Sequence, residues 1–214
     1  MLDTKFERIV GDIGNPLSFD MPVVYKTVTG ATVSRIVKEQ DRKLIQPFID
    51  AALELESEGV DAITTSCGFL ALFQKEIAAE TNVPFYSSSL MQIPLVHAIV
   101  GGPIGVLTAR KASLTRQHLA QVDAETVPTF IYGMDDMPSF TSAIVEETEP
   151  LHEENIEQEM VQTARQLYRN HPEIKGIVLE CTNMPPYKQA IQKEVNVPIF
   201  DIFTLTDFVF RSLP

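Results

Sequence analysis

The sequence predicts an α/β protein with two pseudo-symmetric domains, each a mostly parallel sheet flanked by helices, and a functional site in the cleft between them. Two observations carry this prediction. Apolar runs of strand length alternate with longer segments of helical period, which is typical of parallel α/β sheets. A pattern is also repeated: Cys67 and Cys181, the only cysteines, each follow an apolar stretch and each precede an Asn-Val-Pro tripeptide by fifteen positions.

The two repeats align on their cysteines without a gap. Further identical pairs are Ile63 with Ile177, Ile77 with Ile191, and Glu80 with Glu194. A duplicated unit with one thiol at the same point of each half suggests that both thiols face one site. Such an arrangement suits an enzyme that handles a proton on both faces of a carbon atom.

Short apolar runs define strands that are covered on both faces. The expected strands are Arg8–Asp12, Ala62–Thr65, Phe85–Ser87, Ile104–Thr108, Thr129–Tyr132, Ile177–Leu179 and Ile199–Asp201. Helical spacing of apolar residues predicts helices over Asp41–Ser57, Leu70–Glu80, Gln92–Val100, Ala112–Val122 and Leu151–Tyr168.

The natural boundary between the halves is Gly101-Gly102-Pro103, which separates an expected helix from a new strand. The first domain is therefore expected over residues 1–100, together with a C-terminal segment, 202–214, that returns to pack on it. The second domain is expected over residues 101–201. Clefts between domains are favoured sites for small molecules.

Composition narrows the function. The net charge of −12 leaves no basic stripe to neutralise phosphates, which argues against nucleic acid or an anionic membrane as partner. The beginning of the chain lacks the apolar run of a signal peptide, so we expect a cytoplasmic protein with reduced thiols. No Gly-x-Gly-x-x-Gly, P-loop or Cys-x-x-Cys motif occurs, and we therefore expect neither a nucleotide cofactor nor a metal.

Both cysteines are expected just before helix N-termini, where unpaired amides and the helix dipole favour a thiolate. A lone cysteine in such a sequence is most simply a buried, inert residue. Two cysteines at equivalent points of a duplication, each beside a Thr/Ser-rich loop, favour a catalytic role for Cys67 and Cys181 instead.

Polar side chains gather at the ends of the expected strands, where parallel α/β sheets bind ligands. The substrate-binding candidates are Asp12, Asn15, Thr65, Ser66, Gly68, Thr108, Thr182 and Asn183. Several of these can equally cap helices or turns. Glu180 can tune the thiol beside it, but neighbours in a strand point to opposite faces, which argues against direct contact.

With these residues the chain resembles the aspartate/glutamate racemase superfamily, the cofactor-independent two-thiol enzymes. The superfamily includes hydantoin racemases, maleate isomerases and arylmalonate decarboxylases. The resemblance covers essentially the whole chain. It rests on an opening strand that ends in a polar turn, on a cysteine after Ala62–Ser66, on Ile104–Ala109 opening the second half, and on Cys181-Thr182. It implies pseudo-symmetric α/β domains, a homodimer, Cys67 and Cys181 as an acid/base pair, and Thr182 as a substrate contact.

The chain departs from the amino-acid racemase pattern beside both cysteines. Gly68-Phe69 replaces Asn-Thr after the first cysteine, Glu180 replaces glycine before the second, and Asn183 fills the later position. An acidic amino acid is therefore not implied as the substrate.

The favoured hypothesis is an isomerase, specifically a cofactor-independent racemase of a small carboxylate-bearing substrate. One cysteine thiolate removes the proton α to the carboxylate, and the other thiol delivers a proton to the opposite face. Two alternatives stay open within the superfamily: a dicarboxylate cis-trans isomerase and a decarboxylase. A non-catalytic protein that binds small anions and a thiol redox switch stay open outside it.

Overall fold

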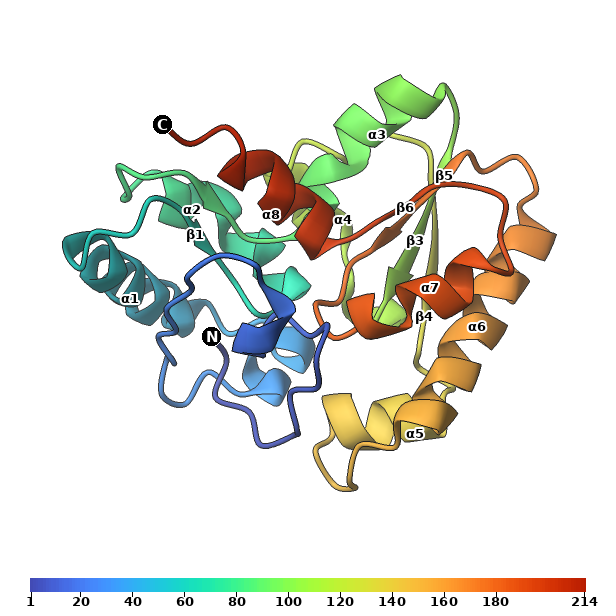
Figure 1. Ribbon diagram of the computed structural model, residues 1–214, viewed down its shortest axis with the longest axis horizontal. Coiled ribbons are helices and arrows are strands. Elements are labelled where there is room, and N and C mark those ends of the chain that lie inside the picture. The colour runs from blue at the N-terminus through green and yellow to red at the C-terminus, as the bar shows by residue number, and fades with distance from the viewer.

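Six short strands form two separate parallel sheets in the computed structural model, which describes all residues, 1–214 (Figure 1). In the smaller sheet β1 (Ile63–Thr64) pairs with β2 (Phe85–Tyr86). The larger sheet has the order β4-β3-β5-β6. Its strands are β3 (Ile104–Thr108), β4 (Thr129–Gly133), β5 (Gly176–Leu179) and β6 (Ile199–Phe200). The α/β class with parallel sheets and flanking helices is thus confirmed.

The helices occupy the segments between the strands, as the apolar spacing predicts. They are α1 (Ile45–Ser57), α2 (Gln74–Ala78), α3 (Ile93–Val100), α4 (Arg116–Gln121), α5 (Pro138–Phe140), α6 (Glu153–Asn170), α7 (Lys188–Gln192) and α8 (Ile202–Phe210). Single turns of 3-10 helix precede several of them, so that α2, for example, continues the 3-10 helix Gly68–Phe73. None of these helices is long and apolar enough to cross a membrane.

The central strands β3 and β5 are buried along their whole length because helices cover both faces of the larger sheet. A Cβ atom added at Gly105 would lie 2.8 Å from Leu167 of α6, whereas one at Gly176 would lie 3.2 Å from Val96 of α3. Gly105 pairs with Ile177, the residue after Gly176. Since adjacent positions point to opposite faces, α6 and α3 cover opposite sides of this sheet.

The sequence repeat sets the same strand register in both halves. The Ile63 amide donates to the Pro84 carbonyl oxygen at 2.9 Å, and the Ile177 amide donates to the Pro198 carbonyl oxygen, also at 2.9 Å. Each proline is the last residue of an Asn-Val-Pro tripeptide, and the strands that follow are β2 and β6. Each cysteine therefore follows the first strand of an equivalent parallel pair.

The segment Arg8–Asp12, expected to be a strand, is a turn. The Asp12 amide donates to the Ile9 carbonyl oxygen at 3.0 Å, and Gly11 has a φ of +96°, which favours glycine. No neighbouring strand pairs with this segment; instead Arg8 forms an ion pair with Asp12, with 3.0 Å between Nη1 and Oδ1. Val10 is 60% exposed, so the apolar residues of this segment do not form the buried face that a strand would need.

Helix α8 lies against the first half of the chain, where Figure 1 shows it in dark red beside the smaller sheet. Its buried residues Ile202 and Leu205 pack in a cluster with Ile13 and Tyr86. The Asp201 carboxylate caps the helix by accepting the Thr204 amide at 2.9 Å. The chain thus passes from β6 in the larger sheet directly to a helix on the other half.

Candidate active site

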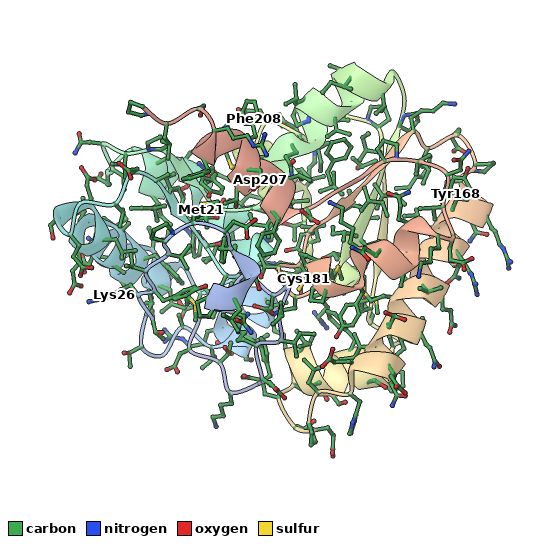
Figure 2. The ribbon with its side chains drawn as sticks, in the orientation of Figure 1. Met21, Lys26, Tyr168, Cys181, Asp207 and Phe208 are labelled. Atoms are coloured by element: carbon green, nitrogen blue, oxygen red, sulfur yellow. The ribbon has the colours of Figure 1, made fainter.

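Cys67 and Cys181 line one small cavity between the two halves of the chain, and Figure 2 shows Cys181 near the centre of the molecule. The cavity has a volume of about 20 Å³, room for about one water molecule. The N-terminal segment, including Leu2 and Phe6, and the π-helical turn Thr141–Val145 contribute to its walls. The two cysteines are therefore brought together, as the repeat predicts, in a closed site.

Cys67 occupies the N-cap position of the 3-10 helix Gly68–Phe73, three residues after the end of β1 at Thr64. Its side chain is buried, and burial raises the pKa of the thiol to about 12. The Glu180 carboxylate adds to this increase. The backbone amides of Phe69 and Leu70 act in the opposite direction. The amides at the helix start thus favour the thiolate, as expected from the sequence, but in the closed site desolvation outweighs them.

Cys181 follows β5 and is also buried. Its thiol donates a 3.3 Å hydrogen bond to Oδ1 of Asn183, and Nδ2 of Asn183 donates to the Asp12 carboxylate. Burial first, and then Glu180, raise the pKa of the Cys181 thiol well above its ordinary value. Both cysteines are free thiols, and Asn183 connects the second of them to the Arg8–Asp12 ion pair.

Glu180 is a fully buried carboxylate that lines the same cavity. Its Oε2 atom accepts a 2.7 Å hydrogen bond from the Thr108 hydroxyl and a longer one, 3.4 Å, from the Ala109 amide. Its Oε1 atom is buried with no hydrogen-bond partner. Burial raises the pKa of this carboxyl group to about 7.

The sequence argument against direct contact of Glu180 with the site does not hold. Strand β5 ends at Leu179, so Glu180 and Cys181 lie beyond the strand and its alternation does not apply. A charged residue directly after the apolar run Ile177–Leu179 is the signal that could have placed it in the site. Gly68 makes room for it, since an added Cβ would lie 2.2 Å from both the Glu180 carbonyl oxygen and Oε1.

Arg8 is a second cavity residue absent from the expected set. Its Nη2 atom donates to the Thr4 hydroxyl at 3.0 Å, and its guanidinium carbon lies 4.3 Å from the centre of the Phe6 ring. Its Nε atom is buried and has no hydrogen-bond partner. The i,i+4 spacing of Arg8 and Asp12 is the sequence signal for this pair, although the apolar residues between them favour a strand.

The expected substrate-binding residues separate into two groups. Ser66, Gly68 and Asn183 line the cavity together with the cysteines. The remaining ones lie behind this lining. Asp12 accepts a hydrogen bond from Asn183, and Thr108 donates one to Glu180. The other three donate to carbonyl oxygens: Thr182 to Ser66 at 2.7 Å, Thr65 to Ser87 at 2.6 Å and Asn15 to Arg8 at 2.7 Å. No group of three or more His, Cys, Asp or Glu side chains is placed to hold a metal ion.

The chain has clear full-length similarity to known proteins. It is 34% identical to a dimethylsulfoniopropionate lyase of Durusdinium sp. clade D, in an alignment that covers 99% of this chain and 72% of that protein. The chain belongs to the dimethylsulfoniopropionate lyase family. It is also 32% identical to dimethylsulfoniopropionate lyase 7 and 30% identical to lyase 3 of Emiliania huxleyi, again over 99% of its length. It spans 65% and 58% of these two proteins, less than two thirds.

The fold of this member of the lyase family is that of the aspartate/glutamate racemases. A sulfate-associated form of arylmalonate decarboxylase matches with a TM-score of 0.58 and 16% identity, over 84% of this chain and 77% of that structure. An aspartate racemase homologue from Pyrococcus horikoshii OT3 matches with a TM-score of 0.57 and 18% identity, over 90% of this chain and 87% of that structure. No protein-family model matches the chain. The resemblance stated from the sequence is thereby confirmed for the fold.

The dimethylsulfoniopropionate lyases correct the activity expected from the sequence. The assignment as an isomerase, with racemisation as the main reaction, is wrong, because the full-length relatives are lyases. The alternative hypothesis that included a decarboxylase agrees better with these relatives, because a decarboxylase is itself a lyase. Abstraction of a proton next to a carboxylate, the step expected of the two thiols, begins a racemisation and an elimination alike.

Proposed function

We propose that this chain is a lyase that cleaves dimethylsulfoniopropionate into dimethyl sulfide and acrylate by β-elimination. The observation that carries the proposal is the pair of thiols, Cys67 and Cys181, on one cavity with the buried carboxylate of Glu180. The substrate is the one in the names of its relatives. It has a carboxylate at one end and a dimethylsulfonium cation at the other, joined by two methylene groups.

The proposed reaction is a β-elimination that needs neither an oxidant nor a reductant. A thiolate removes a proton from the carbon next to the carboxylate, and the electron pair of that C–H bond forms the C=C bond of acrylate. The bond from the β-carbon to sulfur breaks, and its electron pair leaves with neutral dimethyl sulfide. The proton stays on the cysteine until it is released to solvent. Because the leaving group departs as a neutral molecule, no electron sink is required.

Cys67 is the better candidate for the base. The amides of Phe69 and Leu70 act to lower the pKa of Cys67, as does Arg8. The Cys181 thiol has one such amide, from Asn183, and the charge of Asp12 raises its pKa further. Cys67 is therefore the thiol that loses its proton more easily when a cationic substrate enters the site.

The role of Cys181 in an elimination differs from its role in a racemisation. No proton has to be delivered to the opposite face of the carbon, so Cys181 stays protonated. In the closed site its thiol donates to Asn183. We assign it the role of donating to the substrate carboxylate, on which negative charge accumulates as the C–H bond breaks.

The closed cavity supports a reaction that excludes water. A volume of about 20 Å³ is far below that of the substrate, so the walls have to separate before binding. The N-terminal segment is one of these walls, fixed by the hydrogen bond from the Leu2 amide to the Ser66 hydroxyl at 3.0 Å. When it closes over the substrate, the thiolate and the sulfonium interact in a medium of low dielectric constant.

The test is to incubate the purified full chain with dimethylsulfoniopropionate and to measure dimethyl sulfide by gas chromatography and acrylate by NMR. We expect both products in equal amounts. We expect Cys67→Ser to lose activity by about a thousandfold or more, since a serine hydroxyl is a far weaker acid than a thiol. Cys181→Ser retains a hydrogen-bond donor and should lose less.

The matched control is Ser139→Ala on α5, which alters a half-buried hydroxyl away from the cavity. It should keep full activity. Wild-type protein that releases neither product contradicts the proposed function. Equal and small losses in both cysteine variants contradict the assignment of Cys67 as the base.

A further inference from the structure

Two charged side chains of opposite sign line the cavity together with the thiols. Glu180 comes from the end of β5, and Arg8 comes from the N-terminal turn. Each has one buried polar atom without a hydrogen-bond partner, Oε1 in Glu180 and Nε in Arg8. Buried polar atoms in folded proteins are nearly always paired, so these two require an explanation.

The Glu180 carboxylate is held in a way that leaves one oxygen available. Thr108 and Ala109 both donate to Oε2, and no group donates to Oε1. A carboxylate with a purely structural role would be expected to satisfy both oxygens. Gly68 removes the side chain that would otherwise fill the space beside Oε1.

Arg8 is fixed from two sides. Its Nη1 atom contacts Asp12 at 3.0 Å and its Nη2 atom contacts Thr4 at 3.0 Å. The side chain is only 12% exposed, and Asp12 neutralises only one edge of the guanidinium. The unpaired Nε atom lies on the side of Gly14, where an added Cβ would be 3.0 Å away. A guanidinium that lines a closed cavity is suited to a carboxylate.

We propose that this cavity recognises a zwitterion, with Glu180 facing the cationic group of the ligand and Arg8 facing its carboxylate. The assignment deepens the proposed function and rests on it, because it makes Glu180 the residue that selects an onium substrate over an uncharged one of the same shape. Glu180 is thus a specificity-determining residue, and the two charges fix the direction in which the substrate lies between the thiols.

Cation recognition by Glu180 has a proton-linked consequence. Since the pKa of Glu180 is about 7, the free protein near neutral pH holds this carboxyl group partly protonated. The ionisable groups near it are the thiols Cys67 and Cys181, whose pKa values lie far higher, and Arg8, which is paired with Asp12. Binding of a cation should therefore release a proton from Glu180.

The test compares two ligands that differ only in charge. One is 3-(trimethylammonio)propanoate, a quaternary ammonium zwitterion, and the other is 4,4-dimethylpentanoate, in which carbon replaces the charged nitrogen. Calorimetric titration gives both dissociation constants without any turnover. For the wild type we expect the zwitterion to bind at least about tenfold more tightly, with proton release at pH 7. For Glu180→Gln we expect a preference below about twofold and no proton release.

A second pair of ligands tests Arg8. The cation propyltrimethylammonium lacks the carboxylate, and we expect the wild type to bind it at least about tenfold more weakly than the zwitterion. Arg8→Gln should remove this difference, and Arg8→Lys should restore part of it. The comparison within each variant keeps the result independent of small changes in folding.

Glu154→Gln, an exposed position on α6 that loses the same charge, is the control and should bind like the wild type. If Glu180→Gln keeps the full preference for the zwitterion, the proposal is overturned. It is also overturned if the wild type binds both members of the first pair equally or binds neither. If Glu180→Gln fails to fold, proton release by the wild type, measured in buffers of different ionisation enthalpy, decides the question.

Failure of this proposal and failure of the proposed function give different results. A preference for the zwitterion without release of dimethyl sulfide supports charge recognition by Glu180 and Arg8 but contradicts the proposed elimination. Release of dimethyl sulfide without any preference for the zwitterion supports the elimination but contradicts the roles assigned to Glu180 and Arg8.

Discussion

The Thr108 hydroxyl donates a 2.7 Å hydrogen bond to Oε2 of Glu180, and this contact joins the ends of the neighbouring strands β3 and β5. Both residues are fully buried. The bond fixes the orientation of the carboxylate beside the two thiols. It also stabilises the charged form of Glu180 against the effect of burial.

Replacing Thr108 by valine should destabilise the protein and raise the pKa of Glu180. The isosteric side chain leaves Oε2 with only the long bond from the Ala109 amide. We expect the free energy of unfolding to fall by about 1 to 2 kcal/mol at pH 8, measured by urea denaturation. Thr108→Ser keeps the hydroxyl and should recover most of the loss; equal losses in both variants would show that the hydrogen bond is not the cause.

Glu180 should make stability depend on pH. Its pKa is about 7 in the folded protein and near 4.5 when exposed, so the folded state retains a proton that the unfolded state has lost. The contribution is fully favourable below pH 4.5 and disappears as the pH rises through 7, a change of roughly 3 kcal/mol. The wild type should therefore lose stability between pH 5 and 8 relative to Glu180→Gln, in urea denaturation at each pH.

This comparison has to be made as a difference between the two proteins. Burial lowers the pKa of His118 to about 4, so that residue makes the protein more stable as the pH rises from 4 towards 6.5. His118 is unchanged in Glu180→Gln and cancels in the difference. A difference between wild type and variant that stays constant from pH 5 to 8 would contradict the raised pKa of Glu180.

Gly68→Ala should damage both stability and activity. The added methyl group would lie 2.2 Å from the Glu180 carbonyl oxygen, an atom of the backbone that cannot rotate away. We expect a loss of about 1 to 3 kcal/mol in thermal or urea unfolding and a large decrease in kcat/KM. Gly102→Ala is the matched control, because its new methyl group meets only the exposed side chain of Lys175, which can change rotamer. If Gly68→Ala changes neither stability nor kcat/KM, the backbone beside Cys67 is easily displaced.

Asn183→Leu should lower activity without abolishing it. The leucine has a similar size but cannot accept the Cys181 thiol proton or donate to Asp12. A buried hydrogen bond to a charged group is worth about 1.5 to 3 kcal/mol, so we expect kcat/KM to fall about tenfold to a hundredfold. Steady-state assays of dimethyl sulfide release measure this. Unchanged kinetics would remove Asn183 from the arrangement that positions Cys181.

The sequence was most informative where burial alone decides the structure. Strand β3 has the predicted bounds, Ile104–Thr108, because every residue in it is covered on both faces and its apolar run has no competing interpretation. The repeat around Cys67 and Cys181 also placed both thiols correctly at one cavity. The division of the chain at residue 101 into two domains remains a prediction.

The sequence was least informative where side-chain charge decides the structure. Arg8–Asp12 has strand-like apolar residues, yet it is a turn whose ends carry an ion pair. Strand alternation argues against contact of Glu180 with the site, but β5 ends one residue before it. The reaction class could not be deduced from the thiols, since Cys67 and Cys181 can start several reactions from the same proton abstraction. The functions assigned to the individual site residues stay predictions.

The small volume of the closed cavity has a kinetic consequence. Under the proposed elimination, each catalytic cycle would include an opening that admits the substrate and another that releases acrylate, and both would displace protein segments through solvent. Added viscosogens such as sucrose should therefore slow turnover if these movements limit the rate. In that case an α-deuterated substrate would show only a small isotope effect in the steady state, and the full effect on C–H cleavage would appear in a single turnover started from the bound complex.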